Sequence, residues 1–241
     1  MSFQMSRRHF VEAMALGTAS LGLAACGASQ ASSSSQAPAG SSAGSSGQGG
    51  QGSAASSSTA DEDSSLITKP LDNGYGEGLH HATIEVKDFG TISVELNANM
   101  APITVSNFAQ LANDGFYDGL TFHCIIKGFM IQGGDPNGDG TGGSERRIKG
   151  EFVANDVNNT LVHTRGTISM ARSNSNDSAS SQFFIMQETT DSLDGQYAAF
   201  GHVTEGIEVV DAIADKTPVQ DDNGTVARDD QPVIASVKMV D

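Results

Sequence analysis

The stretch that decides the fold runs from Phe122 to Gly134 and has the sequence FHCIIKGFMIQGG. It contains two short apolar runs, 122–126 and 129–132, which are rich in the β-branched and aromatic residues that suit strands. Lys127-Gly128 separates the two runs, and a glycine at such a break suits a tight turn or a bulge. The pattern therefore predicts two adjacent strands.

The second of these runs places Phe129, Met130 and Gln132 close together. They would form an apolar surface that carries one amide, which can both donate and accept a hydrogen bond. An extended, uncharged peptide needs a binding surface of this kind. The stretch therefore indicates a peptide-binding site as well as a pair of strands.

Patterns on both sides of this stretch predict a mainly β domain. Segments 83–87 and 91–96 alternate apolar with polar residues, and Asp88-Phe89-Gly90 between them is typical of a hairpin loop. A helix is predicted to begin at Pro102 and to end at 113–115, where Asn, Asp and Gly follow one another. Further elements are expected as strands at 167–171, 182–187, 198–203 and 233–240, and as a short helix from Ile207 that ends before Pro218. Many short strands with two helices favour a closed antiparallel barrel.

Three blocks of the sequence resemble the signature of cyclophilins, the cyclosporin-binding class of peptidyl-prolyl cis-trans isomerases. The first block is 122–135, the second combines 166–171 with 181–185, and the third is 193–201. Their order and spacing match the family over about residues 80–240. The resemblance implies a closed eight-stranded antiparallel barrel, a helix over each open end, and a peptide groove on the outside of the barrel.

The resemblance also implies the residues of the site. A pocket for the proline ring would be lined by Phe129, Met130, Phe184 and Leu193. Gln132 and the backbone at Ala171 would hold the substrate backbone, and Tyr197 would stand at the pocket rim. Taken alone, each apolar residue is more often a plain core residue, and Gln132 could instead be a partner in an internal network.

Cys124 occupies the position at which the family has its catalytic arginine. Rotation about an X-Pro bond faces a barrier of about 18–20 kcal/mol and needs no nucleophile, metal or cofactor. It is accelerated by a donor aimed at the prolyl nitrogen, because twisting makes that nitrogen a better acceptor. A neutral thiol cannot mimic a guanidinium, although Lys127, Arg146, Arg147 or Arg172 could supply charge from nearby.

Two functions follow from this substitution. The first is a prolyl isomerase slowed by Cys124, with Phe129 and Gln132 as the other catalytic residues. The second is a non-catalytic, chaperone-like module that binds proline peptides and has lost the donor. Isomerase activity is the function that we expect.

No other constellation indicates chemistry. His123 is interpreted as a buried ring with its hydrogen bonds satisfied, and no Ser-His-Asp or Cys-His set is recognisable. Segment 135–140 imitates the first half of an EF-hand loop, but Arg146 stands where the twelfth position needs a glutamate. We therefore expect a turn-rich surface loop, and neither a metal nor a cofactor.

The N-terminal part predicts export and anchoring. Residues 1–25 combine Arg7-Arg8 with a short apolar stretch, as in a signal peptide of the twin-arginine kind, with the general secretion route as the alternative. Leu23-Ala24-Ala25-Cys26 resembles a bacterial lipoprotein box, in which the cysteine is acylated; the alternative is an ordinary signal peptide with a coincidental cysteine. Residues 27–65 are rich in Ser, Ala, Gly and Gln and predict a flexible linker between Cys26 and a domain at 66–241.

Composition limits the possible partners. The 241 residues include 13 Lys and Arg against 29 Asp and Glu, a formal net charge of −16, which argues against nucleic acid and anionic membrane surfaces. Two cysteines exclude a disulfide framework. The expected protein is a monomer in the cell envelope, held to the membrane by its lipid anchor alone. Its expected partners are proline-containing peptides and unfolded exported proteins.

Overall fold

A computed structural model describes residues 65–241. The predicted signal peptide, the lipidation site at Cys26 and most of the linker lie outside the described residues. In residues 65–241, no helix is both long and apolar enough to cross a membrane.

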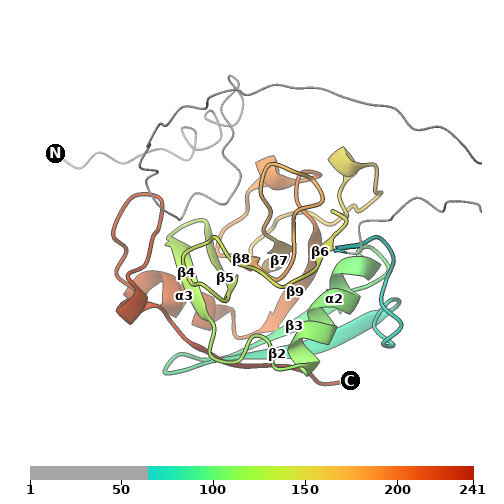
Figure 1. Ribbon diagram of the computed structural model, residues 1–241. Coiled ribbons are helices and arrows are strands. Elements are labelled where there is room, and N and C mark those ends of the chain that lie inside the picture. Colours follow the sequence, from blue (N-terminus) through green and yellow to red (C-terminus); the bar gives the residue numbers. More distant parts are fainter. Residues whose placement is uncertain (1–64) are drawn as a thin grey trace, which may run out of the picture.

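An eight-stranded antiparallel sheet forms the body of the molecule (Figure 1). The strands, in chain order, are β2 (Leu79–Val86), β3 (Gly90–Asn97), β4 (Thr121–Ile126), β5 (Met130–Asp135), β7 (Thr167–Met170), β8 (Phe183–Met186), β9 (Ala199–Glu205) and β10 (Ile234–Met239). Their order in the sheet is β10-β2-β3-β9-β7-β8-β5-β4. The predicted eight antiparallel strands are therefore confirmed.

The sheet curls until its two edge strands meet. An isolated bridge joins Thr121 of β4 to Val233, next to β10. Phe122 N donates to Pro232 O at 2.9 Å, and Ile234 N donates to Leu120 O at 2.8 Å. Within residues 65–241, β4 and β10 do not form a continuous ladder of hydrogen bonds with each other. The sheet is therefore strongly curled, and it does not close into a barrel with every strand paired on both sides.

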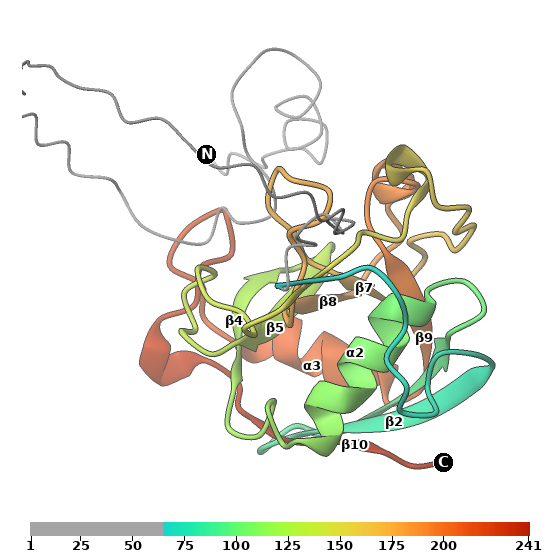
Figure 2. The same cartoon turned by 45° about the vertical axis from the view of Figure 1, so that its right-hand side comes forward.

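Two helices pack on this sheet, as predicted (Figure 2). The first, α2 (Pro102–Asn113), has proline in its first turn and lies against β3 and β10. The second, α3 (Ile207–Lys216), follows a left-handed Gly206 and lies against β3 and β5. Helix α2 buries the apolar face that its sequence predicts: Val105, Phe108, Ala109 and Ala112.

Aromatic side chains fill the interior of the curled sheet. Phe108 of α2 packs edge-on against Phe183 of β8 at 5.7 Å between ring centroids, and tilted against Phe200 of β9 at 5.3 Å. Phe122 of β4 meets Phe183 edge-on at 6.1 Å. Such contacts add to the free energy gained from burying these rings. The interior therefore fixes the positions of β4 and β8, whose other faces point outward.

The hairpin quoted first is formed as predicted. Strands β4 and β5 pair antiparallel, and Gly128 in the turn between them has a left-handed φ of 76°. Gly134, near the end of β5, has a φ of 82°, and a Cβ there would lie 2.7 Å from Ser181 O. Both positions therefore need glycine.

Several short elements were not predicted. A parallel pair joins β1 (Leu66–Ile67) to β6 (Arg147–Ile148). Three 3-10 turns were also missed: η1 (Val153–Asn155), η2 (Asp191–Leu193) and η3 (Arg228–Asp230). Elements of two or three residues are too short to show a hydrophobic period.

Candidate active site

A second apolar cluster lies apart from the interior core, and we call it the outer cluster. It consists of Cys124, Met130, Ala171, Phe184, Met186, Leu193 and Tyr197, with Ile126 and Phe129 packed against it. Every apolar residue that was predicted for the site belongs to it. The structure therefore brings the predicted residues together, while their roles stay predictions.

Strand alternation explains why the cluster forms. In β8, Phe183 and Ile185 belong to the interior core, whereas Phe184 and Met186 belong to the outer cluster. In β4, the pairing shifts by one residue between Phe122 and Cys124, which leaves His123 as an extra, bulged residue.

The register of the neighbouring strands completes the arrangement. Gln132 of β5 lies opposite Cys124 on one side and opposite Phe184 on the other. These three residues therefore lie in one row across β4, β5 and β8.

Gln132 is the polar residue within this row, and it is 1% exposed. Its Nε2 donates to Gln182 Oε1 at 2.9 Å. Gln182 Nε2 in turn donates to Gly140 O and Gly142 O, which ties the amide pair to the glycine-rich loop, residues 136–146, between β5 and β6. The Oε1 atom of Gln132 is buried without a hydrogen-bond partner in the described part of the chain. Gln132 is thus a partner in a hydrogen-bond network, and its Oε1 remains an unsatisfied acceptor. Burying an acceptor without a hydrogen bond costs about 1–3 kcal/mol of stability.

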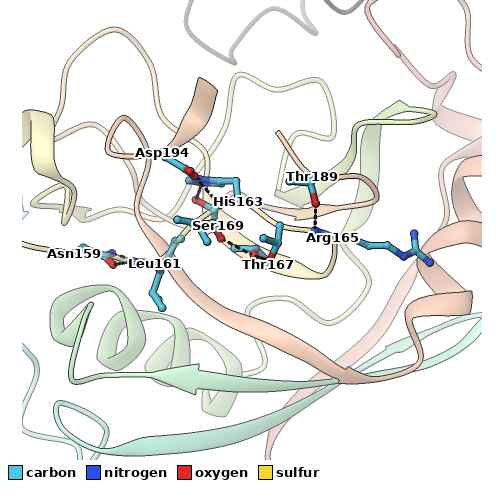
Figure 3. A network of polar contacts seen from close by, with 11 residues as sticks. Asn159, Leu161, His163, Arg165, Thr167, Ser169, Thr189 and Asp194 are labelled. Atoms are coloured by element: carbon cyan, nitrogen blue, oxygen red, sulfur yellow. Dashed lines mark hydrogen bonds and ion pairs between the residues drawn. The ribbon is translucent and has the colours of Figure 1, made fainter. Parts of the chain in front are cut away.

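A series of polar contacts joins His163 to Ser169 and Asp194 (Figure 3). His163 Nδ1 lies 2.9 Å from Asp194 Oδ1, and His163 Nε2 lies 3.0 Å from Ser169 Oγ. The backbone N–H of His163 also donates to Asp194 Oδ1, at 2.7 Å. The imidazole stacks on the Phe184 ring, with 5.9 Å between centroids. Burial lowers the pKa of His163, against the smaller raising effect of Asp194.

These contacts join Ser169, His163 and Asp194 in a Ser-His-Asp arrangement, whereas the sequence expectation was that no catalytic set of this kind is recognisable. Because the Asp194 carboxylate can only accept, Nδ1 donates to it, and in the neutral ring Nε2 then accepts the Ser169 hydroxyl. Ser169 is fully buried, so the carbonyl of a substrate cannot reach its oxygen. This arrangement therefore positions Phe184 and supplies no nucleophile. Sequence spacing gave no signal for it, because the segment before β7 and the residue after η2 come together only in the folded chain.

Comparison with known proteins gives the family. Residues 81–240 match the family model of cyclophilin type peptidyl-prolyl cis-trans isomerases. This chain belongs to the cyclophilins. It is therefore a peptidyl-prolyl cis-trans isomerase by homology.

Individual relatives agree. Peptidyl-prolyl cis-trans isomerase B of Bacillus subtilis is 47% identical over 123 residues, which cover 51% of this chain and 82% of the relative. The peptidyl-prolyl cis-trans isomerase of Helicobacter pylori is 47% identical over 135 residues, which cover 55% and 80%. A crystal structure of a Cryptosporidium parvum cyclophilin in the presence of the dipeptide Ala-Pro superposes with a TM-score of 0.59 at 30% identity, and covers 67% of this chain and 99% of that one.

Cys124 is the residue at which the family resemblance predicts a departure from the family's arginine. It is 2% exposed, and its Sγ lies 3.4 Å from Asn223 O. Of the cations considered as substitutes for the arginine, Lys127 pairs with Asp215 at 2.8 Å. Arg147 lies in β6, where its Nη2 donates to Ser65 Oγ at 3.1 Å.

Two further cations complete the comparison. Arg146 is exposed on the glycine-rich loop. Arg172 stacks over Tyr197, with its Cζ atom 4.7 Å from the ring centroid. Arg172 therefore contacts the outer cluster, through Tyr197.

His123 differs from its predicted state. It is buried, as expected, but neither ring nitrogen has a hydrogen-bond partner in residues 65–241, so the expectation of a satisfied ring was wrong. Desolvation lowers its pKa, and the carboxylates of Asp135 and Asp139 oppose that effect. The residue borders a cavity of about 370 Å³, together with Asn137, Asp139, Thr225, Arg228 and Gln231 among others.

The carboxylate of Asp135 holds the glycine-rich loop by accepting hydrogen bonds from the loop backbone. Asp135 is 1% exposed, and its carboxylate accepts N–H groups from Asn137 at 2.9 Å, Asp139 at 3.1 Å and Gly140 at 2.6 Å. In the part of the chain that the structure describes, no group of three or more His, Cys, Asp or Glu residues could hold a metal ion. The resemblance of this segment to a calcium loop is therefore explained by an Asp-capped turn.

Proposed function

We propose that this cyclophilin isomerises X-Pro bonds slowly, because Cys124 stands where the family has its arginine. The observation that carries the proposal is the place of Cys124 in the row with Gln132 and Phe184, within the outer cluster. A cysteine side chain cannot present the forked cation that a guanidinium offers. The twisted prolyl nitrogen then loses its preorganised donor.

The rest of the site still favours catalysis. The outer cluster supplies an apolar surface that would desolvate the proline ring, with Phe129, Met130, Phe184 and Leu193 around it. By the family resemblance Gln132 would hold the substrate backbone, and its buried Oε1 has no hydrogen-bond partner within residues 65–241. Holding the ring and the backbone orients the amide for rotation, so residual catalysis is expected.

The test restores the donor. Cys124→Arg in the full chain should raise kcat/KM for prolyl isomerisation at least about tenfold, because loss of one such donor typically costs about 10²–10³ in rate. Peptide affinity should change much less, since the new bond belongs mainly to the twisted state. Cys124→Ala is the matched control, and it should not raise the rate.

Three outcomes separate the alternatives. A wild-type rate equal to that of the arginine variant would show that another group supplies the donor. Peptide binding without isomerisation in the wild type would favour the non-catalytic, chaperone-like module. Faster turnover in Cys124→Arg alone would support the proposal.

We also propose that the protein acts on exported proteins from a lipid anchor at the cell envelope. The support is the lipoprotein-like Leu23-Ala24-Ala25-Cys26 and the Ser- and Gly-rich segment that follows it. Cys26→Ser should leave the precursor unacylated and uncleaved at that site. Mass spectrometry of the wild-type N-terminus tests this, and an unacylated N-terminus at another residue would contradict it.

A further inference from the structure

Arg172 is held in a fixed position at the rim of the outer cluster. Its guanidinium lies between two rings, with Cζ 4.7 Å from the centroid of Tyr197 and 5.0 Å from that of Phe152. Nε donates to Gln196 O at 3.0 Å, and Nη1 donates to Ser173 O at 2.9 Å. Two ring faces and two carbonyls therefore orient the planar group before any ligand arrives.

This guanidinium has no carboxylate partner in residues 65–241. Other cations do: Lys127 pairs with Asp215, and Arg165 pairs with Asp211. Asp194, which lies three residues before Tyr197, is bonded to His163 instead. In a chain of formal charge −16, this guanidinium is a fixed positive charge at the edge of an apolar cluster.

The position of Arg172 determines which groups of a bound peptide its guanidinium can contact. It directly follows Ala171 and stacks on Tyr197, and both of these residues belong to the outer cluster. If the outer cluster takes the proline ring, the guanidinium lies within reach of the residues next to that proline. Its remaining N–H groups can bind a carboxylate through charge-assisted hydrogen bonds.

We propose that Arg172 is a specificity-determining residue, which makes this cyclophilin prefer proline peptides that carry an acidic side chain next to the proline. The inference rests on the proposed function of the outer cluster as the proline site. It adds the substrate class, which is acidic Glu-Pro or Pro-Glu sequences.

The experiment compares matched peptides by NMR titration of the full chain. All are N-acetylated and C-amidated: Ala-Glu-Pro-Ala against Ala-Gln-Pro-Ala, and Ala-Ala-Pro-Glu against Ala-Ala-Pro-Gln. A fifth peptide, Ala-Ala-Pro-Ala with a free C-terminal carboxylate, separates a side-chain carboxylate from a chain end. We expect one glutamate peptide to bind about threefold to tenfold more tightly than its glutamine partner. The preference should shrink near 1 M salt, where the screening length is about 3 Å.

Variants assign that preference to Arg172. Arg172→Gln should abolish the preference for glutamate, whereas Arg172→Lys, which keeps the charge and loses the planar fork, should retain part of it. Lys238→Gln is the matched control, because it removes the same charge from an exposed position on β10. It should leave the preference unchanged, which excludes an effect of overall charge. Thermal unfolding of each variant checks that the fold is kept.

The outcomes are distinct. Equal affinity for glutamate and glutamine peptides, a gain only for the free chain end, or a preference that survives in Arg172→Gln would each overturn this inference alone. Failure of every proline peptide to bind, the glutamine peptides included, would overturn the proposed function and this inference with it.

Discussion

The interior core and the outer cluster share strands β4, β5 and β8, and the residues of both are buried. They differ in how they connect to the rest of the molecule. In β8, Phe183 is 0% exposed on the inner side and Phe184 is 0% exposed on the outer side. The interior core is one continuous cluster, in which Phe108 contacts three other aromatic rings, one edge-on and two tilted. The outer cluster is separate from it and is bordered by the unpaired Oε1 of Gln132. Burial alone therefore does not distinguish a core from a candidate binding site, whereas separation from the interior core does.

The largest expected effect comes from the interior. Phe108→Ala removes a fully buried ring that contacts Phe183, Phe200 and Tyr117. We expect a loss of about 3–5 kcal/mol in the free energy of unfolding, because a cavity remains where the ring was. Urea unfolding followed by circular dichroism measures it. A loss below about 1 kcal/mol would mean that the interior core contributes less to stability than the burial of Phe108 implies.

A smaller effect on stability, with a larger effect on binding, is expected from the outer cluster. Phe129 is only partly buried and packs against the cluster from the turn between β4 and β5. Phe129→Ala should weaken the binding of a proline peptide by about 1–3 kcal/mol through lost apolar contact. The free energy of unfolding should change less than in Phe108→Ala. NMR titration with an Ala-Pro peptide measures the binding, and unchanged affinity would count against a proline site here.

Much of the fold could be predicted from the sequence, because alternation and helix signals are local. The hairpin of β4 and β5 and the start of α2 at Pro102 are of this kind. The β1–β6 pair could not be predicted, since two residues carry no period. The single bridge between Thr121 and Val233, in place of a continuous ladder, also could not be predicted. It depends on how far the sheet curls, which no local pattern specifies.

The candidate site was predictable to a different extent. The residues alone indicated only the surface of Phe129, Met130 and Gln132, and the remaining positions came from the family resemblance. The contacts of His163 with Ser169 and Asp194 arise from strand register and a returning loop, so spacing could not reveal them. The missing partner of His123 likewise depends on the side chains that surround the bulge.

The small parallel pair of β1 and β6 also has a mechanical consequence. Arg147 N donates to Ser65 O at 2.7 Å, and Lys149 N donates to Ile67 O at 2.9 Å, while Ile67 is 4% exposed in the interior core. A pulling force applied to the chain before residue 65 would load these bonds and the burial of Ile67 first. The β1–β6 pair would thus bear the tension before β4 and β5 did. A force applied on the N-terminal side of residue 65 would therefore leave the outer cluster unchanged until the β1–β6 pair separated.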